Sequence, residues 1–122
     1  MTNLMDMAFP DNDFVVINSG GFRTIWYPGV IEYQHFYNMF PFTNIVSSFE
    51  INGEEILKMM EVLQSGKKGF YPTKKLKHFI SISRNGTRKL TDLTFSSGEP
   101  IDPTRNYKGL SLDFLLKGGD DF

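Results

Sequence analysis

The sequence predicts a single α+β domain. Its 122 residues are the size of one domain, and a chain of this length can bury about two-thirds of its unfolded surface. Apolar runs of strand length occur along the chain together with segments of helical periodicity, and turn residues separate them. No repeat, linker or low-complexity stretch interrupts this order. Helices and strands are therefore expected to share one hydrophobic core.

The first half of the chain is predicted to contain two helices and two strands. Residues 2–9 are typical of the end of a helix, and Phe14–Ile17 is a continuous apolar run typical of a strand that is buried on both faces. The turn at residues 18–21 ends this strand. A second helix is expected around Tyr33–Met39, and Ile45–Ile51 is predicted to be a second strand.

The second half is predicted to begin with a helix over residues 54–64 that ends at Gly66. Four apolar side chains share one face of this helix: Ile56, Leu57, Met60 and Leu63. Alternating apolar residues from Leu76 predict a strand, and Asn85-Gly86 is typical of a hairpin turn before a strand over Leu90–Phe95. The last predicted strand ends near Leu112.

Composition excludes several classes of function. The formal net charge is -1, from 13 basic and 14 acidic residues that are interspersed, so no basic surface for nucleic acid or an anionic membrane is indicated. The absence of cysteine excludes disulfides, thiol nucleophiles and cysteine-based zinc sites. No apolar run approaches the roughly 18 residues of a membrane span. We therefore expect neither a nucleic-acid partner nor a membrane span in this chain.

Neither histidine is placed for catalysis or metal binding. His35 is expected on the surface of a helix and His78 on the inner face of a strand, and no H-x-x-x-H spacing brings two ligands onto one helical face. No serine lies in a G-x-S-x-G turn, and no glycine-rich Walker pattern occurs. We therefore expect no catalytic residue and no metal site in this chain.

A glycine-rich turn after the first strand, "NSGGFR" (Asn18–Arg23), is the best candidate for a binding site. Glycines allow close backbone approach, while amide and guanidinium groups donate hydrogen bonds to ligand oxygens. The segments "FPFTN" (40–44) and "DFLLKGGD" (113–120) again pair an aromatic ring with a short polar or glycine-rich turn. A base stacked on an aromatic ring gains roughly 1–3 kcal/mol, so Phe42 and Phe114 are candidates for the walls of a nucleoside pocket. The alternative is that both are ordinary core residues.

Six motifs follow one another along nearly the whole chain: "NLMDM", "FVVINSGGFR", "FPFTN", "INGEEILKMME", "GEPIDPTRNY" and "DFLLKGGDDF". Together they resemble the C-terminal domain of the 5'-nucleotidase family, which includes periplasmic UDP-sugar hydrolases and animal ecto-5'-nucleotidase. The fourth motif is similar to the family's helix after a strand and a glycine turn. The other five are similar to the family's G-N-L-x-x-D-A-M, N-G-G-G-I-R, L-P-F-G-N, G-x-P-x-D-P…Y and N-F-L-x-x-G-G-D-G-F.

This resemblance implies a division of labour between two domains. In the family, an N-terminal metallophosphoesterase domain with two divalent metal ions hydrolyses nucleoside 5'-monophosphates or related nucleotides, and the C-terminal domain determines substrate specificity. Residues 1–122 would be part of that C-terminal domain, with a mixed β-sheet and packed helices. The expected partners are a nucleoside or nucleotide and the N-terminal domain of the parent chain. The chain alone would be inactive, and the parent would be extracellular or periplasmic.

The resemblance also assigns the substrate-binding residues by position. Phe42 and Phe114 would sandwich the base, and Asn44 would bond to its edge. Asp120 would accept hydrogen bonds from the ribose hydroxyls. The residues on either side of the glycine pair would contact the ribose or phosphate side of the nucleotide: Asn18 and Arg23.

Some positions depart from the family pattern. Lys74 and Lys75 stand where the family has a serine and a glycine in a loop that lines the pocket. Facing inward they would crowd the base or contact phosphate, whereas facing outward, as we expect, they would be solvated charges. Asp121 replaces a glycine of the last motif. The family has further elements after this motif and a further substrate-binding arginine before the first one, so the resemblance implies that both ends are shortened.

The alternative function is a non-catalytic interaction or regulatory module that keeps the fold with a decayed pocket. The two lysines favour this alternative. The joint retention of Asn18, Arg23, Phe42, Phe114 and Asp120 argues against it.

Overall fold

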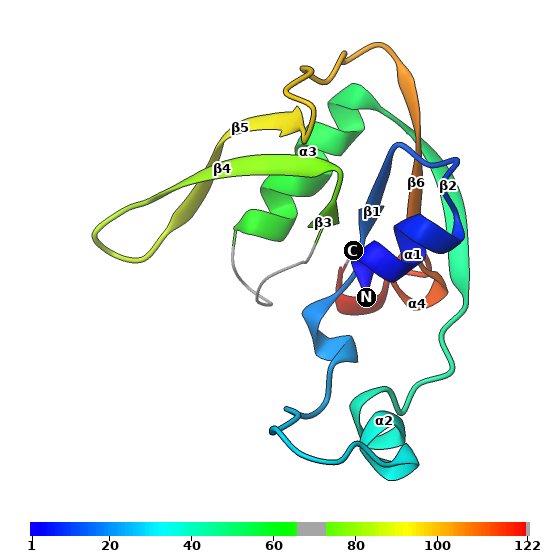
Figure 1. The fold of residues 1–122 in the computed structure, drawn as a ribbon. Coiled ribbons are helices and arrows are strands. Elements are labelled where there is room, and N and C mark those ends of the chain that lie inside the picture. Colours follow the sequence, from blue (N-terminus) through cyan, green and yellow to red (C-terminus); the bar gives the residue numbers. More distant parts are fainter. Residues whose placement is uncertain (66–72, 122) are drawn as a thin grey trace.

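A four-stranded mixed sheet forms the centre of the domain, with the strand order β2-β6-β1-β3 (Figure 1). The computed structural model describes residues 1–65 and 73–121. β6 pairs antiparallel with β2 and parallel with β1, and β3 pairs antiparallel with β1. The strands are β1 (Phe14–Val16), β2 (Val46–Asn52), β3 (Thr73–Lys74) and β6 (Asn106–Leu112). The predicted α+β fold with a mixed sheet and packed helices is confirmed.

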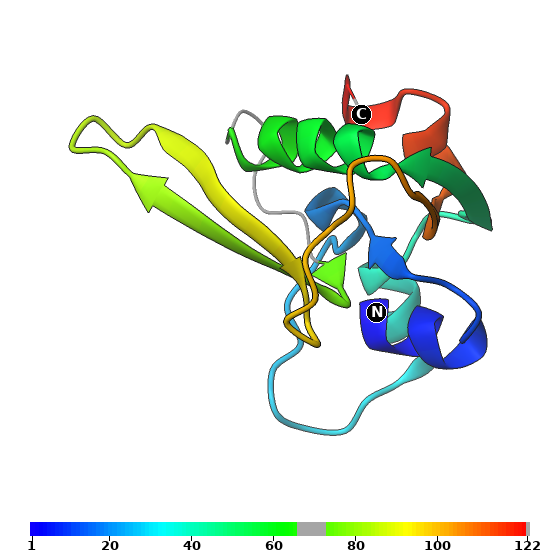
Figure 2. The same ribbon diagram turned by 90° about the horizontal axis from the view of Figure 1, so that it is seen from above.

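Helices cover both faces of this sheet, with α1 (Thr2–Ala8) on one side of β1 and α3 (Gly53–Gln64) on the other (Figure 2). Phe14 and Val16 of β1 belong to the core cluster under α3, whereas Val15 packs with Met5 of α1. Successive side chains of a strand point to opposite faces, so a strand covered on both sides must be apolar throughout. The prediction that this strand is buried on both faces is confirmed.

The helix α3 buries the apolar face that its spacing predicts. Ile56, Met60 and Leu63 are buried, and Leu57 is partly buried. Asn52 caps the helix, because its Oδ1 accepts the Glu55 N–H at 2.9 Å while Glu55 Oε2 accepts the Asn52 N–H at 3.1 Å. The helix is described through Gln64 and Ser65 follows it, so the end predicted at Gly66 lies outside the described residues.

The strands β4 (Leu76–Ile82) and β5 (Arg88–Phe95) form the predicted hairpin, which projects beside α3 (Figure 1). Leu76 is buried and His78 is partly buried, as expected for the inner face, but Ile82 on the same side is 63% exposed. The hairpin extends beyond the core, so the alternation continues there without burial.

The segment between β1 and β2 contains the predicted helix α2 (Tyr33–Met39) and lies at one end of the molecule (Figure 1). His35 is exposed on α2, as predicted for a helix surface. Two elements were not predicted: the two-residue strand β3 and the four-residue helix α4 (Asp113–Leu116). Short 3-10 turns, η1 (Ser19–Gly21) and η2 (Gly119–Asp121), follow β1 and α4. Elements this short carry no periodicity.

Candidate functional site

Asn18 lies just beyond the C-terminal end of β1, where the turn begins. The strand is buried through Ile17, and Asn18 is still only 8% exposed. The η1 turn then reverses the chain, and the Arg23 N–H donates to the Met39 carbonyl at 3.1 Å at the end of α2. The Arg23 guanidinium approaches the Gly20 carbonyl at 3.5 Å. The predicted glycine-rich turn is thus tied to both β1 and α2.

Asp120 lies opposite Asn18, although the two residues are 102 positions apart in the sequence. Asn18 Nδ2 donates to Asp120 Oδ2 at 3.1 Å. The chain reverses after α4 through Gly118, which has φ +86°, and Asp120 itself has φ +57°. Aspartate tolerates this left-handed conformation better than most residues, and glycine adopts it without strain.

The other polar atom of the Asn18 side chain, Oδ1, has no hydrogen-bond partner among the residues that the structure describes. This oxygen is also buried. An unsatisfied buried acceptor is unfavourable by about 1–3 kcal/mol. A ligand group that donates a hydrogen bond to this oxygen would remove that penalty.

Two aromatic side chains, Phe42 and Phe114, line the same cavity as Asn18 and Asp120. Phe42 is 53% exposed and Phe114 is 44% exposed, so neither is an ordinary core residue. The Arg23 guanidinium lies 5.6 Å from the centre of the Phe42 ring, within cation–π range. Gly119 packs directly on Phe114, because a Cβ at position 119 would lie 2.6 Å from the Phe114 ring and 2.5 Å from its carbonyl oxygen.

These side chains line one cavity of about 170 Å³. Every substrate-binding residue predicted from the sequence contributes to it, together with two glycines of the turn. The lining residues are Asn18, Gly20, Gly21, Arg23, Phe42, Asn44, Phe114 and Asp120. The fold therefore brings together three segments that the sequence keeps far apart.

A second, more apolar cavity adjoins the first. It shares four lining residues with the first cavity: Asn18, Gly21, Phe42 and Asn44. Its other walls are aliphatic and aromatic side chains from the N-terminal segment with α1, from the residue after β1, from β2 and β6, and from the two residues that flank the segment of α2: Met1, Met5, Ile17, Val46, Leu112, Phe22 and Phe40. Phe22 and Phe40, whose ring centres are 5.5 Å apart, are two of these wall residues that the sequence did not single out. Nothing in their spacing distinguishes them from core phenylalanines.

Asp113, which the sequence reasoning also missed, stands beside the cavity. Its Oδ1 accepts the Ile45 N–H at 3.0 Å, and its Oδ2 accepts from the Lys117 ammonium at 3.0 Å. The Lys117 hydrogen bond, supported by the Ile45 N–H, lowers the pKa of the Asp113 carboxyl below its ordinary value. This residue is a carboxylate at neutral pH.

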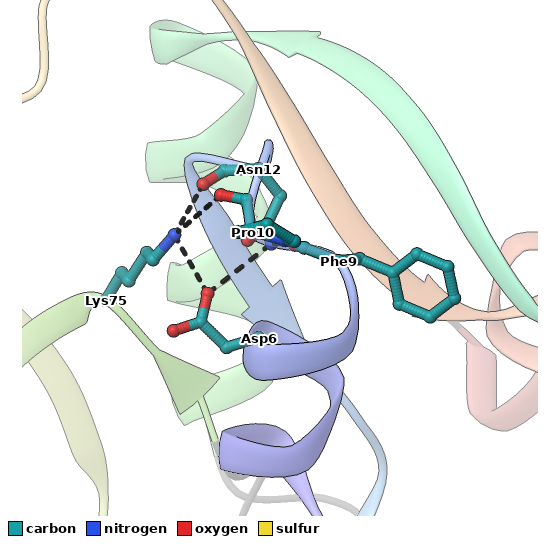
Figure 3. A network of polar contacts seen from close by, with 5 residues as sticks. All are labelled: Asp6, Phe9, Pro10, Asn12 and Lys75. Atoms are coloured by element: carbon teal, nitrogen blue, oxygen red, sulfur yellow. Dashed lines mark hydrogen bonds and ion pairs between the residues drawn. The ribbon is translucent and has the colours of Figure 1, made fainter.

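The orientation of Lys75 differs from the expectation of a solvated charge. Its ammonium lies 2.8 Å from Asp6 Oδ1 of α1 and donates to the Asn12 carbonyl at 2.7 Å (Figure 3). Asn12 Nδ2 also donates to Asp6 Oδ1 at 3.4 Å and to the Phe9 carbonyl. The Lys75 hydrogen bond lowers the pKa of Asp6. Lys75 thus points away from the cavity, as expected, but it holds the loop after α1 instead of being merely solvated.

The backbone of Lys75 adopts the left-handed conformation, next to the strand β3. Lys75 has φ +66°, a conformation that costs an ordinary L-residue about 1–2 kcal/mol. Lys74, the preceding residue, pairs with Val15 in the sheet. Neither lysine lines either of the two cavities described above.

The arrangement of these side chains is suited to binding a ligand. It offers two aromatic faces, a guanidinium, a carboxylate and two amides around one cavity. Among residues 1–65 and 73–121, no three His, Cys, Asp or Glu side chains gather as metal ligands would. In the same part of the chain, no helix has the length and apolar character to cross a membrane.

The sequence matches the family described as "5'-nucleotidase, C-terminal domain" over residues 1–122. The chain belongs to the 5'-nucleotidase family. It is 43% identical over 112 residues to a 5'-nucleotidase of Vibrio cholerae and 34% identical over 112 residues to "Silent protein UshA(0)" of Salmonella typhimurium. Both alignments cover 90% of this chain, but only 19% and 20% of those relatives.

Solved structures agree with this assignment of the fold. The 5'-nucleotidase precursor of Thermus thermophilus superposes with a TM-score of 0.79 at 24% identity, covering 98% of this chain and 25% of that one. The NAD nucleotidase NadN of Haemophilus influenzae gives a TM-score of 0.76 at 20% identity, with 98% and 23% covered. This 5'-nucleotidase C-terminal domain therefore spans about a fifth to a quarter of the length of these relatives.

Proposed function

We propose that this domain recognises the substrate of a 5'-nucleotidase-like hydrolase. The observation that carries the proposal is the joint presence of Asn18, Arg23, Phe42, Asn44, Phe114 and Asp120 around one cavity. In this proposal the base lies between the rings of Phe42 and Phe114, and Asn44 bonds to its edge. Stacking on an aromatic ring contributes roughly 1–3 kcal/mol per base.

The polar wall supports a ribose as the second part of the ligand. Asp120 offers carboxylate oxygens that accept from hydroxyl groups, and the buried Oδ1 of Asn18 lacks a donor among the described residues. A sugar hydroxyl supplies such donors. Arg23 stands beside this wall and is assigned to the ribose or phosphate side of the nucleotide.

The chemical step is assigned to another part of the parent protein. We expect the parent to hydrolyse nucleoside 5'-monophosphates or related nucleotides to nucleoside and phosphate, in an N-terminal metallophosphoesterase domain with two divalent metal ions. The described residues of this chain do not fit such a metal centre, since no three potential ligands gather among them. The domain alone is therefore proposed to be inactive. From the family resemblance, the parent is proposed to be extracellular or periplasmic.

The alternative of a decayed pocket loses its main support. The two lysines at positions 74 and 75 favoured that alternative, but the Lys75 ammonium forms an ion pair with Asp6, and neither lysine lines the cavity. The polar contact between Asn18 and Asp120 is also intact. These observations favour a retained pocket over a module that keeps only the fold.

A two-dimensional amide NMR titration with adenosine and then AMP tests the proposal. We expect chemical-shift changes confined to residues 18–23, 42–44 and 114–120. Phe42→Ala and Phe114→Ala should each weaken adenosine binding by about tenfold or more, since each removes one stacking surface. Phe79→Ala is the matched control, because Phe79 is 44% exposed, as Phe114 is, but lies on the hairpin.

Two results would contradict the proposal. Equal affinity in the Phe42, Phe114 and Phe79 variants would show that the rings do not hold the base. Phosphate release from AMP with added Mg²⁺ or Zn²⁺, in proportion to the amount of this protein, would show that the domain is not inactive by itself.

A further inference from the structure

The junction between β6 and α4 uses a side chain where a strand would use its backbone. The Asp113 N–H donates to the Ile45 carbonyl at 2.8 Å, one step beyond the last ladder pair, Val46 and Leu112. The Asp113 carbonyl is engaged elsewhere, because it accepts the Lys117 N–H at 3.1 Å within α4. The Ile45 N–H therefore donates to the Asp113 side chain, at 3.0 Å from Oδ1.

These two hydrogen bonds extend the pairing of β2 with β6 by one residue pair, Ile45 and Asp113, which we call the rung. In an antiparallel hydrogen-bonded pair, the two residues exchange both N–H···O bonds. Ile45 and Asp113 do the same, except that the carboxylate oxygen replaces the carbonyl. The chain can thus turn from a strand into a helix at Asp113 without leaving the Ile45 N–H unpaired.

The rung stands between two residues of the candidate site. Asn44 directly precedes Ile45, and Phe114 directly follows Asp113, and both line the cavity. We propose that Asp113 is a positioning residue for nucleoside binding, which holds the segment of Phe42 and Asn44 at a fixed distance from the helix that carries Phe114. This inference rests on the proposed function of the cavity.

Lys117 orients the carboxylate but is not itself the connection. Its ammonium lies 3.0 Å from Asp113 Oδ2, and its side chain is 76% exposed. Exposed ion pairs contribute little to stability. The rung depends on an acceptor at Oδ1 and not on the negative charge, so an asparagine at position 113 should preserve it while an alanine should not.

The experiment compares D113A, D113N and K117Q in the full chain. Its first readout is the hydrogen-exchange rate of the Ile45 amide without ligand, and its second is the affinity for adenosine by calorimetry. In D113A we expect the Ile45 amide to exchange at least about tenfold faster and adenosine affinity to fall about fivefold to tenfold, the loss that one ordinary hydrogen bond explains. In D113N and K117Q both readouts should stay within about threefold of the wild type.

The outcomes separate this inference from the proposed function. A wild-type chain that binds no adenosine overturns the proposed function, and the Ile45 amide then still decides whether Asp113 holds the two segments. Unchanged exchange and affinity in D113A overturn the positioning role, and so does an equal loss in D113A and D113N. If D113A does not fold, protection of the Ile45 amide in D113N and its affinity for adenosine decide the question.

Discussion

Substitution of Gly119 by alanine tests whether the Phe114 ring is a wall of the binding site. The added Cβ would lie 2.5 Å from the Phe114 carbonyl oxygen and 2.6 Å from two carbons of its ring. The carbonyl belongs to the backbone of α4 and does not move easily, so the backbone at residue 119 has to shift to relieve that contact, and the ring has to shift to relieve the other. Overpacking of this kind costs about 1–3 kcal/mol of folding free energy. Loss of the ring as a stacking surface should weaken adenosine binding by about tenfold or more.

Gly118→Ala provides the matched control in the same turn. Gly118 has φ +86°, so alanine there is strained by about 1–2 kcal/mol, but its Cβ would meet no atom within 4 Å. Both variants should therefore unfold at a lower temperature than the wild type. With an unfolding entropy of about 2.1 cal/mol/K per residue, each lost kcal/mol lowers Tm by about 4 °C in a chain of 122 residues. Only Gly119→Ala should also lose affinity.

Calorimetric unfolding and isothermal titration with adenosine measure the two effects separately. Adenosine affinity of Gly119→Ala equal to that of the wild type would show that the Phe114 ring has no part in binding. An equal loss of affinity in Gly118→Ala and Gly119→Ala would also contradict this role of the ring. In that case the loss would follow from a general distortion of the turn.

Two further predictions concern stability. Lys75→Met should lower Tm by about 4–12 °C, because it removes a cation that is only 32% exposed and leaves Asp6 without its ionic partner; Lys58→Met, which breaks a pair with exposures of 68% and 65%, should change Tm by no more than about 2 °C. Equal shifts in thermal unfolding would contradict this difference. Lys75 lowers the pKa of Asp6, and Lys117 lowers the pKa of Asp113. The two ionised carboxylates therefore stabilise the fold fully above about pH 4, and this stabilisation is lost as the pH falls through the lowered pKa values. Calorimetry between about pH 2.5 and about pH 6 should show that Tm falls below about pH 4, and that it falls less steeply in Asp6→Asn than in the wild type. Identical slopes of Tm against pH in the two proteins would refute the assignment of this effect to Asp6.

The site could be predicted in part because its residues lie in recognisable motifs. Asn18 and Arg23 flank a glycine pair, and Phe114 and Asp120 belong to one C-terminal motif. Their assignment to a ligand came from the resemblance to a family, since an aromatic residue alone is equally consistent with a core position. Asp113 could not be recognised, because its role depends on a hydrogen bond to Ile45, which is 68 positions away.

The contacts of Lys75 could not be predicted from the sequence either. The sequence offered two orientations, toward the pocket or toward solvent, and the structure adopts a third, on Asp6 of α1. A side chain with four rotatable bonds can reach any of these partners. Which one it reaches depends on where β3 places α1, and no local pattern contains that information.

The sequence by itself determined the order and type of the longer elements, because burial on one face or on both leaves a period that can be counted. The unbroken apolar run of β1 and the spaced apolar residues of α3 are examples. Only the tertiary structure decided which turns meet. The parallel pairing of β1 with β6 brings Asn18 within 3.1 Å of Asp120 across 102 positions, since strand pairing depends on contacts that are distant in the sequence and leave no periodic signal in either strand.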